Sequence, residues 1–123
     1  ALEGAPGDYW TTLGIGLTHA ERNEQDQAIE YFEAAVATEP DEPEAYYQLA
    51  EALVAQGRFD DAVFPYKQAL ALNPDWLEPL VGLGNAYLNL DDCQSANMPL
   101  QRALQLWPDH EESLQVLRAC AVQ

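Results

Sequence analysis

The chain has 123 residues, of which 48% are hydrophobic, and 21 aspartates and glutamates oppose only five lysines and arginines. This length suffices for one domain with a buried core, and the hydrophobic share is that of a globular protein. The net charge of −16 repels phosphate groups, which excludes nucleic acid and anionic membrane surfaces as expected partners. No apolar run approaches the roughly 20 residues that a membrane-spanning helix requires.

We interpret residues 1–8 as a leader or linker, because Gly4, Pro6 and Gly7 interrupt any helix there. They show none of the features of a signal peptide, so we expect a cytoplasmic protein. A chain that opens on Ala1 is also consistent with a fragment of a longer protein.

From residue 9 onward, the sequence repeats itself every 34 residues. Internal repeats of this length are typical of arrays in which each unit packs against its neighbours. Three units follow, at about 9–42, 43–76 and 77–110. The positions in register are Pro40, Pro74 and Pro108; Ala28, Ala62 and Ala96; Ala35, Ala69 and Ala103; and Phe32, Tyr66 and Leu100.

Each unit divides into two predicted helices. Apolar residues recur at spacings of three and four, which is the spacing of one helix face. Asn23, Gly57 and Asp91 stand between the two halves, and all three residue types tolerate the left-handed backbone that ends a helix. Small residues stand where paired helices are expected to cross, so that the backbones can approach closely. These are Gly16, Ala28, Ala50, Ala62, Gly84 and Ala96.

Pro65 and Pro99 fall inside predicted second helices, 34 residues apart. A proline in a helix interior costs about 3 kcal/mol. The alanines that repeat every 34 residues stand on both sides of each proline, and they predict helix before and after it. Neither proline therefore marks a helix boundary. We expect each to bend its helix and to set the curvature of the stack.

The period of 34, the bulky-Leu-Gly-aromatic pattern of the first helix and the Ala-aromatic-Ala-Pro pattern of the second resemble the tetratricopeptide repeat. The resemblance covers about residues 9–110. It implies an all-α, right-handed superhelical solenoid of antiparallel helix pairs. Residues 111–123 resemble the helix that caps such arrays, which makes about seven helices in total.

In tetratricopeptide arrays, the first helices line a concave groove that holds a peptide or a partner's helix. The resemblance therefore implies a non-enzymatic protein-interaction scaffold. The helical spacing predicts an apolar floor with acidic flanks, suited to an amphipathic helix or peptide with apolar anchors and basic flanks. Gly14 and Gly82 are expected to leave room for a bulky ligand group. The expected contact residues are Trp10, Leu13, Leu17, Tyr47, Gln48, Glu51, Val81, Asn85, Leu88 and Asn89.

Two other functions stay open, namely a self-assembly module and an accessory domain of a larger enzyme. A third function, the binding of chaperone tails, can be compared with this sequence residue by residue. The best-known tetratricopeptide subgroup holds the C-terminal tails of Hsp70 and Hsp90 with lysine, arginine and asparagine. Because the matching positions here contain no cation, a chaperone tail is not the expected ligand. Those positions hold Leu13, Leu17, Gln48, Glu78 and Gly82.

No catalytic, phosphate-binding or zinc motif is recognisable, and we expect no enzyme activity, cofactor or dedicated metal site. His110 stands beside Glu111 and Glu112 at a predicted helix start, where metal binding would be incidental. Cys93 and Cys120 are expected to be buried free thiols, with a disulfide between them as the alternative.

Overall fold

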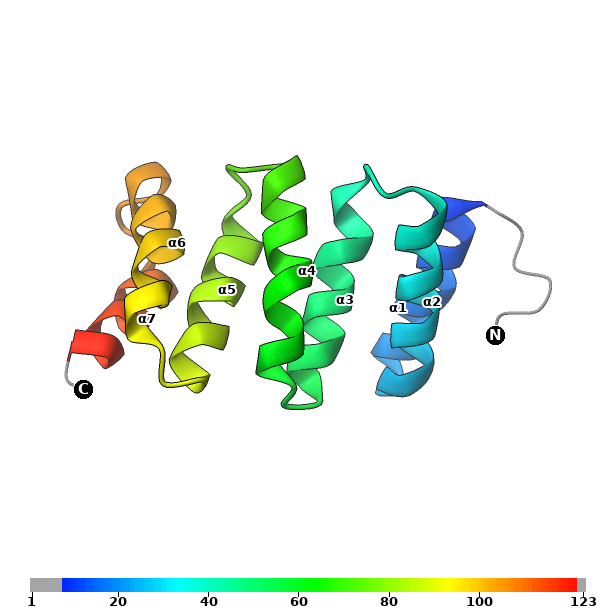
Figure 1. The fold of residues 1–123 in the computed structure, drawn as a ribbon, viewed down its shortest axis with the longest axis horizontal. Helices are drawn as coiled ribbons and strands as arrows, with labels where there is room; N and C mark the ends of the chain where they lie inside the picture. The colour runs from blue at the N-terminus through cyan, green and yellow to red at the C-terminus, as the bar shows by residue number, and fades with distance from the viewer. Residues whose placement is uncertain (1–7, 122–123) are drawn as a thin grey trace.

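The computed structural model describes residues 8–121, and within that range the chain forms seven α-helices and no strands. The helices stand side by side in one elongated row, with α1 and α2 at one end and α6 and α7 at the other (Figure 1). This is the predicted all-α solenoid of helix pairs. None of the described helices is both long and apolar enough to cross a membrane. Their bounds are α1 Tyr9–Glu21, α2 Gln25–Thr38, α3 Pro43–Ala55, α4 Phe59–Leu72, α5 Leu77–Asn89, α6 Cys93–Leu106 and α7 Glu111–Ala121.

The turns within the helix pairs have the left-handed backbone conformation that the sequence predicts. Asn23 and Asp91 adopt φ values of 61° and 59°, and Gly57 adopts 75°. All three residues therefore take the left-handed conformation predicted for the end of a first helix. The helix bounds keep the 34-residue period throughout. First helices begin at Tyr9, Pro43, Leu77 and Glu111, and second helices at Gln25, Phe59 and Cys93.

Several helix starts are stabilised by capping residues. The side chain of Asp8 accepts a hydrogen bond from the backbone N–H of Trp10 at 3.2 Å, and Asp92 accepts one from Ser95 at 3.2 Å. Pro43 is the first residue of α3, a position where its missing N–H has no cost. These local signals help to fix the starts of α1, α3 and α6.

Small residues let the paired helices approach each other. A Cβ atom added to Gly16 would lie 2.6 Å from the ring of Phe32, and one added to Gly84 would lie 2.6 Å from Leu100. A large side chain of the second helix thus occupies the space that each glycine leaves on the first. This confirms the role predicted for the two glycines, and the alanines of the same set are buried or nearly so.

Gly84→Ala is expected to lower the free energy of unfolding by about 1–3 kcal/mol, because the new methyl group overlaps Leu100. Gly14 in α1 has no heavy atom within 4 Å of an added Cβ. The matched control Gly14→Ala should therefore be neutral or stabilise the fold by up to about 1 kcal/mol. Urea denaturation followed by circular dichroism measures both variants, and equal destabilisation of the two would contradict this packing.

Pro65 and Pro99 lie inside α4 and α6, and both are buried. The helices continue through both prolines, as the repeated alanines on either side predict. The bend expected at each proline stays a prediction. The equivalent residue of α2, Tyr31, instead stacks on the ring of His19 with a centroid distance of 5.4 Å.

Cys93 and Cys120 form a disulfide bond, so the expectation of free thiols is wrong. Cys93 opens α6 and Cys120 lies near the end of α7, and their Cα atoms are 5.4 Å apart although 27 positions separate them in the chain. Their pairing depends on how α7 folds back onto α6, which the spacing alone does not reveal. Disulfides persist in oxidising compartments, so this bond and the expectation of a cytoplasmic protein point to different compartments.

Reduction of the disulfide is expected to lower the free energy of unfolding by about 3–4 kcal/mol, because the bond restricts a loop of this length in the unfolded chain. Urea denaturation with and without a phosphine reductant measures the difference. The Cys93→Ala/Cys120→Ala variant is the control, since its stability should be low and indifferent to the reductant. An unchanged wild-type midpoint on reduction would refute this role for the bond.

Candidate functional site

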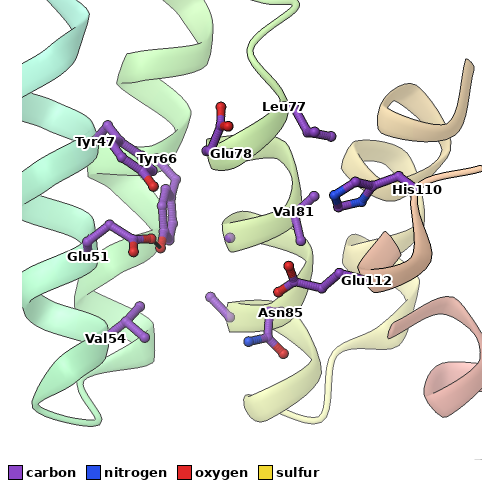
Figure 2. A pocket seen from close by; sticks show the side chains of 12 residues that line it. Tyr47, Glu51, Val54, Tyr66, Leu77, Glu78, Val81, Asn85, His110 and Glu112 are labelled. Carbon is purple, nitrogen blue, oxygen red and sulfur yellow. Dashed lines mark hydrogen bonds between the residues drawn. The ribbon is translucent and has the colours of Figure 1, made fainter. Parts of the chain in front are cut away.

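A pocket of about 350 Å³ lies between α3, α5 and the beginning of α7 (Figure 2). Most of its residues come from the first helices α3 and α5, the helices to which the resemblance assigns the groove. We call it the acidic pocket. Its lining residues are Tyr47, Glu51, Val54, Tyr66, Leu77, Glu78, Val81, Gly82, Asn85, Ala86, His110 and Glu112.

Three exposed carboxylates surround the acidic pocket, and each comes from a different helix. Glu51 belongs to α3, Glu78 to α5 and Glu112 to α7. No lysine or arginine is among the described residues that line the pocket. Carboxylates that converge in this way create a negative potential, which attracts cationic groups.

Tyr66 reaches the acidic pocket from α4, behind the two first helices. Its hydroxyl group donates a hydrogen bond to Oε2 of Glu51, and its side chain is only 1% exposed. A Cβ atom on Gly82 would lie 2.6 Å from Cζ and 2.7 Å from the hydroxyl oxygen of Tyr66. Gly82 therefore makes room for Tyr66 rather than for a ligand, and the prediction for this glycine is wrong.

Aromatic rings form one wall of the acidic pocket. The ring of Tyr47 lies 4.9 Å from that of Trp76 and 6.4 Å from that of Tyr66, measured between centroids. Burial, with the nearby charges of Glu51 and Glu78, raises the pKa of Tyr47 to about 12. Burial, followed by the hydrogen bond to Glu51, also raises the pKa of Tyr66. Both phenols stay neutral near pH 7, and the hydroxyl of Tyr66 remains a donor.

These raised pKa values predict a loss of stability at alkaline pH. The folded chain holds the two phenolic protons more tightly than the unfolded chain. The contribution of Tyr47 and Tyr66 to the free energy of unfolding is therefore fully present below about pH 10. It is lost as the pH rises towards the folded values, from about 10 to about 12 for Tyr47. Urea denaturation at about pH 8 and about pH 11 measures the fall in the free energy of unfolding.

The Tyr66→Phe variant tests the assignment of this effect. It should cost about 1 kcal/mol near pH 7 through the lost hydrogen bond, and it should show a smaller fall at alkaline pH than the wild type. An alkaline fall of the same size in the variant would contradict the role of Tyr66.

The C-terminal helix completes the acidic pocket. Nδ1 of His110 accepts a hydrogen bond from the backbone N–H of Ser113 at 3.3 Å and forms a second one, at 2.9 Å, with the hydroxyl group of the same residue. These bonds hold the imidazole at the rim, where its ring points towards Val81 (Figure 2). Glu112 follows on α7, and the disulfide ties that helix to α6. The helix expected only to cap the array thus supplies part of the site.

Four of the ten expected contact residues line the acidic pocket. Val81 forms part of the floor and is only 5% exposed, whereas Glu51 is exposed. Whether any of them contacts a partner stays a proposal. The four are Tyr47, Glu51, Val81 and Asn85.

Three expected contact residues serve the packing of the helices instead. Leu13 is 3% exposed and belongs to the core, so the prediction that it faces a partner is wrong. Leu17 is half-buried and packs against the same core. Leu88 packs against the cluster at the C-terminal end, which includes Leu100 and Val116.

The other three expected contact residues lie at the surface outside the acidic pocket. Trp10 is 62% exposed and meets the ring of Tyr9 edge-on at 4.8 Å. Gln48 donates a hydrogen bond to Glu44 at 2.8 Å. Asn89 donates one to the backbone carbonyl of Asn85 at 2.8 Å. None of the three lines the acidic pocket, although Asn85, the partner of Asn89, does.

Five residues that line the acidic pocket were not expected from the sequence. They are Tyr66, Leu77, Ala86, His110 and Glu112. Tyr66 is in register with Phe32 and Leu100, and of these three residues it alone has a polar group in its side chain. That hydroxyl group was the available signal, because a buried phenol usually finds a hydrogen-bond partner.

The sequence and the fold agree on the class of protein. The family model described as Tetratricopeptide repeat matches residues 13–75, just over half of the 123 residues. The chain therefore belongs to the tetratricopeptide repeat family. No curated protein sequence matches it significantly.

Solved structures of low sequence identity share this fold. The structure described as the first TPR of Spaghetti (RPAP3) bound to the HSP90 peptide SRMEEVD is 22% identical, with a TM-score of 0.88, over 93% of this chain and 90% of that one. MamA protein is 22% identical, with a TM-score of 0.91, over 98% of this chain and 66% of that one. The second TPR domain of human RPAP3, in complex with the HSP70 peptide SGPTIEEVD, is 16% identical, with a TM-score of 0.85, over 92% and 98%.

Proposed function

We propose that this protein is a non-catalytic interaction scaffold that holds a peptide or amphipathic helix with apolar anchors and basic flanks in the acidic pocket. The observation that carries the proposal is that Glu51, Glu78 and Glu112 line one hollow, whose described lining includes no lysine or arginine. The fold supports the general role, because tetratricopeptide domains usually act as interaction modules. The negative charge of the pocket supports the more specific proposal of a partner with basic flanks.

A lysine or arginine side chain of the partner would lie across Tyr47, with its charged end between Glu78 and Glu112. A cation over an aromatic face gains about 0.5–2 kcal/mol, and an exposed ion pair gains about 0.2–1 kcal/mol. Apolar anchors beside it would rest on Val54 and Leu77. The charges would then govern specificity and the association rate more than the final affinity.

The proposed ligand differs in charge from the peptides in the similar structures. The HSP90 peptide SRMEEVD and the HSP70 peptide SGPTIEEVD both end in acidic residues. Glu78 stands at one of the positions where the chaperone-binding subgroup carries a cation, and Glu112 adds a second negative charge nearby. Like charges repel, so we propose a basic partner in place of an acidic chaperone tail.

Two synthetic helical peptides of about 14 residues test the charge preference. Both carry leucine at every third or fourth position, and they differ only in having lysine or glutamate between the leucines. The wild-type protein should bind the lysine peptide in fluorescence anisotropy, and Glu78→Gln should weaken that binding about threefold to tenfold. Added salt should weaken it further.

Glu21→Gln is the matched control, because it removes an equal charge from the exposed last residue of α1, outside the acidic pocket. It should bind the lysine peptide nearly as tightly as the wild type. Equal binding by Glu78→Gln and the wild type would refute the proposed site. Light scattering tests the alternative of self-assembly, which requires the mass of the free protein to grow with concentration.

A further inference from the structure

A second, larger pocket of about 510 Å³ lies on the other side of α5 from the acidic pocket. Helix α5 directs Val81 and Asn85 to the acidic pocket, and Leu80, Leu83 and Tyr87 to this second one. Its lining is mainly apolar and comes from α4, α5 and α6. We call it the Pro99 pocket. Its remaining lining residues are Lys67, Leu70, Ser95, Met98, Pro99 and Arg102.

The Pro99 pocket is a repeated feature of the array. One unit earlier, α2, α3 and α4 form a similar hollow of about 380 Å³, which we call the Pro65 pocket. Eight of the nine lining positions of each pocket correspond to one another at the 34-residue spacing. The lining residues of the Pro65 pocket are Glu33, Val36, Tyr46, Leu49, Leu53, Arg58, Asp61, Phe64 and Pro65.

Each proline is buried beside a large apolar side chain that is exposed at the rim. Phe64, before Pro65, is 64% exposed, and Met98, before Pro99, is 81% exposed. Exposed apolar residues beside an apolar hollow are typical of interaction surfaces. The two interior prolines thus mark the walls of two pockets, a role that the sequence pattern did not indicate.

The two pockets share a shape but differ in charge. The Pro65 pocket carries Glu33 where the Pro99 pocket has Lys67, and Asp61 where the latter has Ser95. The lining of the Pro99 pocket therefore holds two cations and no carboxylate, in a chain that has only five lysines and arginines. Lys67 makes no ion pair with any residue in the range 8–121.

We propose that the Pro99 pocket docks an acidic amphipathic segment of a partner protein. An apolar side chain of that segment rests on Leu80, Leu83 and Met98, and a neighbouring carboxylate meets Lys67. Arg102 lies on the same rim, but its charge is already paired with Asp75, so Lys67 is the cation available to the carboxylate. Charge complementarity is the reason for this occupant, because the acidic pocket and the Pro65 pocket both carry carboxylates and this lining carries none.

The proposal concerns a different surface from the acidic pocket and does not depend on it. The two pockets use opposite sides of α5 and prefer opposite charges. A basic ligand on one side and an acidic ligand on the other can therefore bind the same molecule together.

The glutamate peptide described above is the probe, added to the ¹⁵N-labelled full chain in the oxidised state. Amide shifts in nuclear magnetic resonance spectra should concentrate on α4, α6 and the Leu83 side of α5. Lys67→Glu gives this pocket the residue found at the equivalent position of the Pro65 pocket, and it should weaken binding about fivefold or more. Met98→Gln should also weaken binding, and its exposed position makes it compatible with folding.

Glu33→Lys is the reciprocal variant, since it transfers the cation to the Pro65 pocket. It should keep the shifts around Pro99 and add a second set around Phe64 and Pro65. The absence of shifts at millimolar peptide, shifts confined to the acidic pocket, or equal binding by Lys67→Glu would each overturn the proposal. Self-association of the free protein that Lys67→Glu abolishes would also overturn it, because the occupant would then be a second copy. None of these outcomes involves the lysine peptide or Glu78, on which the proposed function rests.

Discussion

The close approach of neighbouring helices depends on small residues at the points where the helices meet. A helix pair of this size cannot bury its apolar faces by itself, so each unit must pack tightly on the next. Gly16 and Gly84 receive the side chains of Phe32 and Leu100 from the second helix of the same pair. Gly82 receives Tyr66 from the preceding pair. The same steric device therefore joins helices within a unit and between units.

The contact between Gly82 and Tyr66 links packing to the candidate site. Because Gly82 has no side chain, the phenol of Tyr66 passes between two first helices and its hydroxyl group reaches Glu51. That hydrogen bond fixes one of the three carboxylates on which the charge of the acidic pocket depends. Any side chain introduced at Gly82 would displace Tyr66 and so alter the position of Glu51.

The sequence predicts the structural features that depend on residues close together in the chain. It does not predict those that depend on how one unit packs on the next. The turn at Gly57 and the continuous helix through Pro65 follow from short-range geometry and from the 34-residue period. Helical spacing identifies which face of α1 carries Leu13, but not that α1 packs deeply enough to bury it. The pairing of Cys93 with Cys120 likewise depends on the angle at which α7 docks.

The disulfide makes the two ends of the array unequal in stability. Helix α7 begins at Glu111, one period after α5, so it occupies the place of a further first helix. The bond from Cys93 to Cys120 therefore fastens two successive units covalently, whereas α1 and α2 hold to α3 by packing and hydrogen bonds alone among the described residues. In a linear array the ends open most easily, and here one end is locked. Under a pulling force or a protease, this molecule would come apart from α1 towards α7.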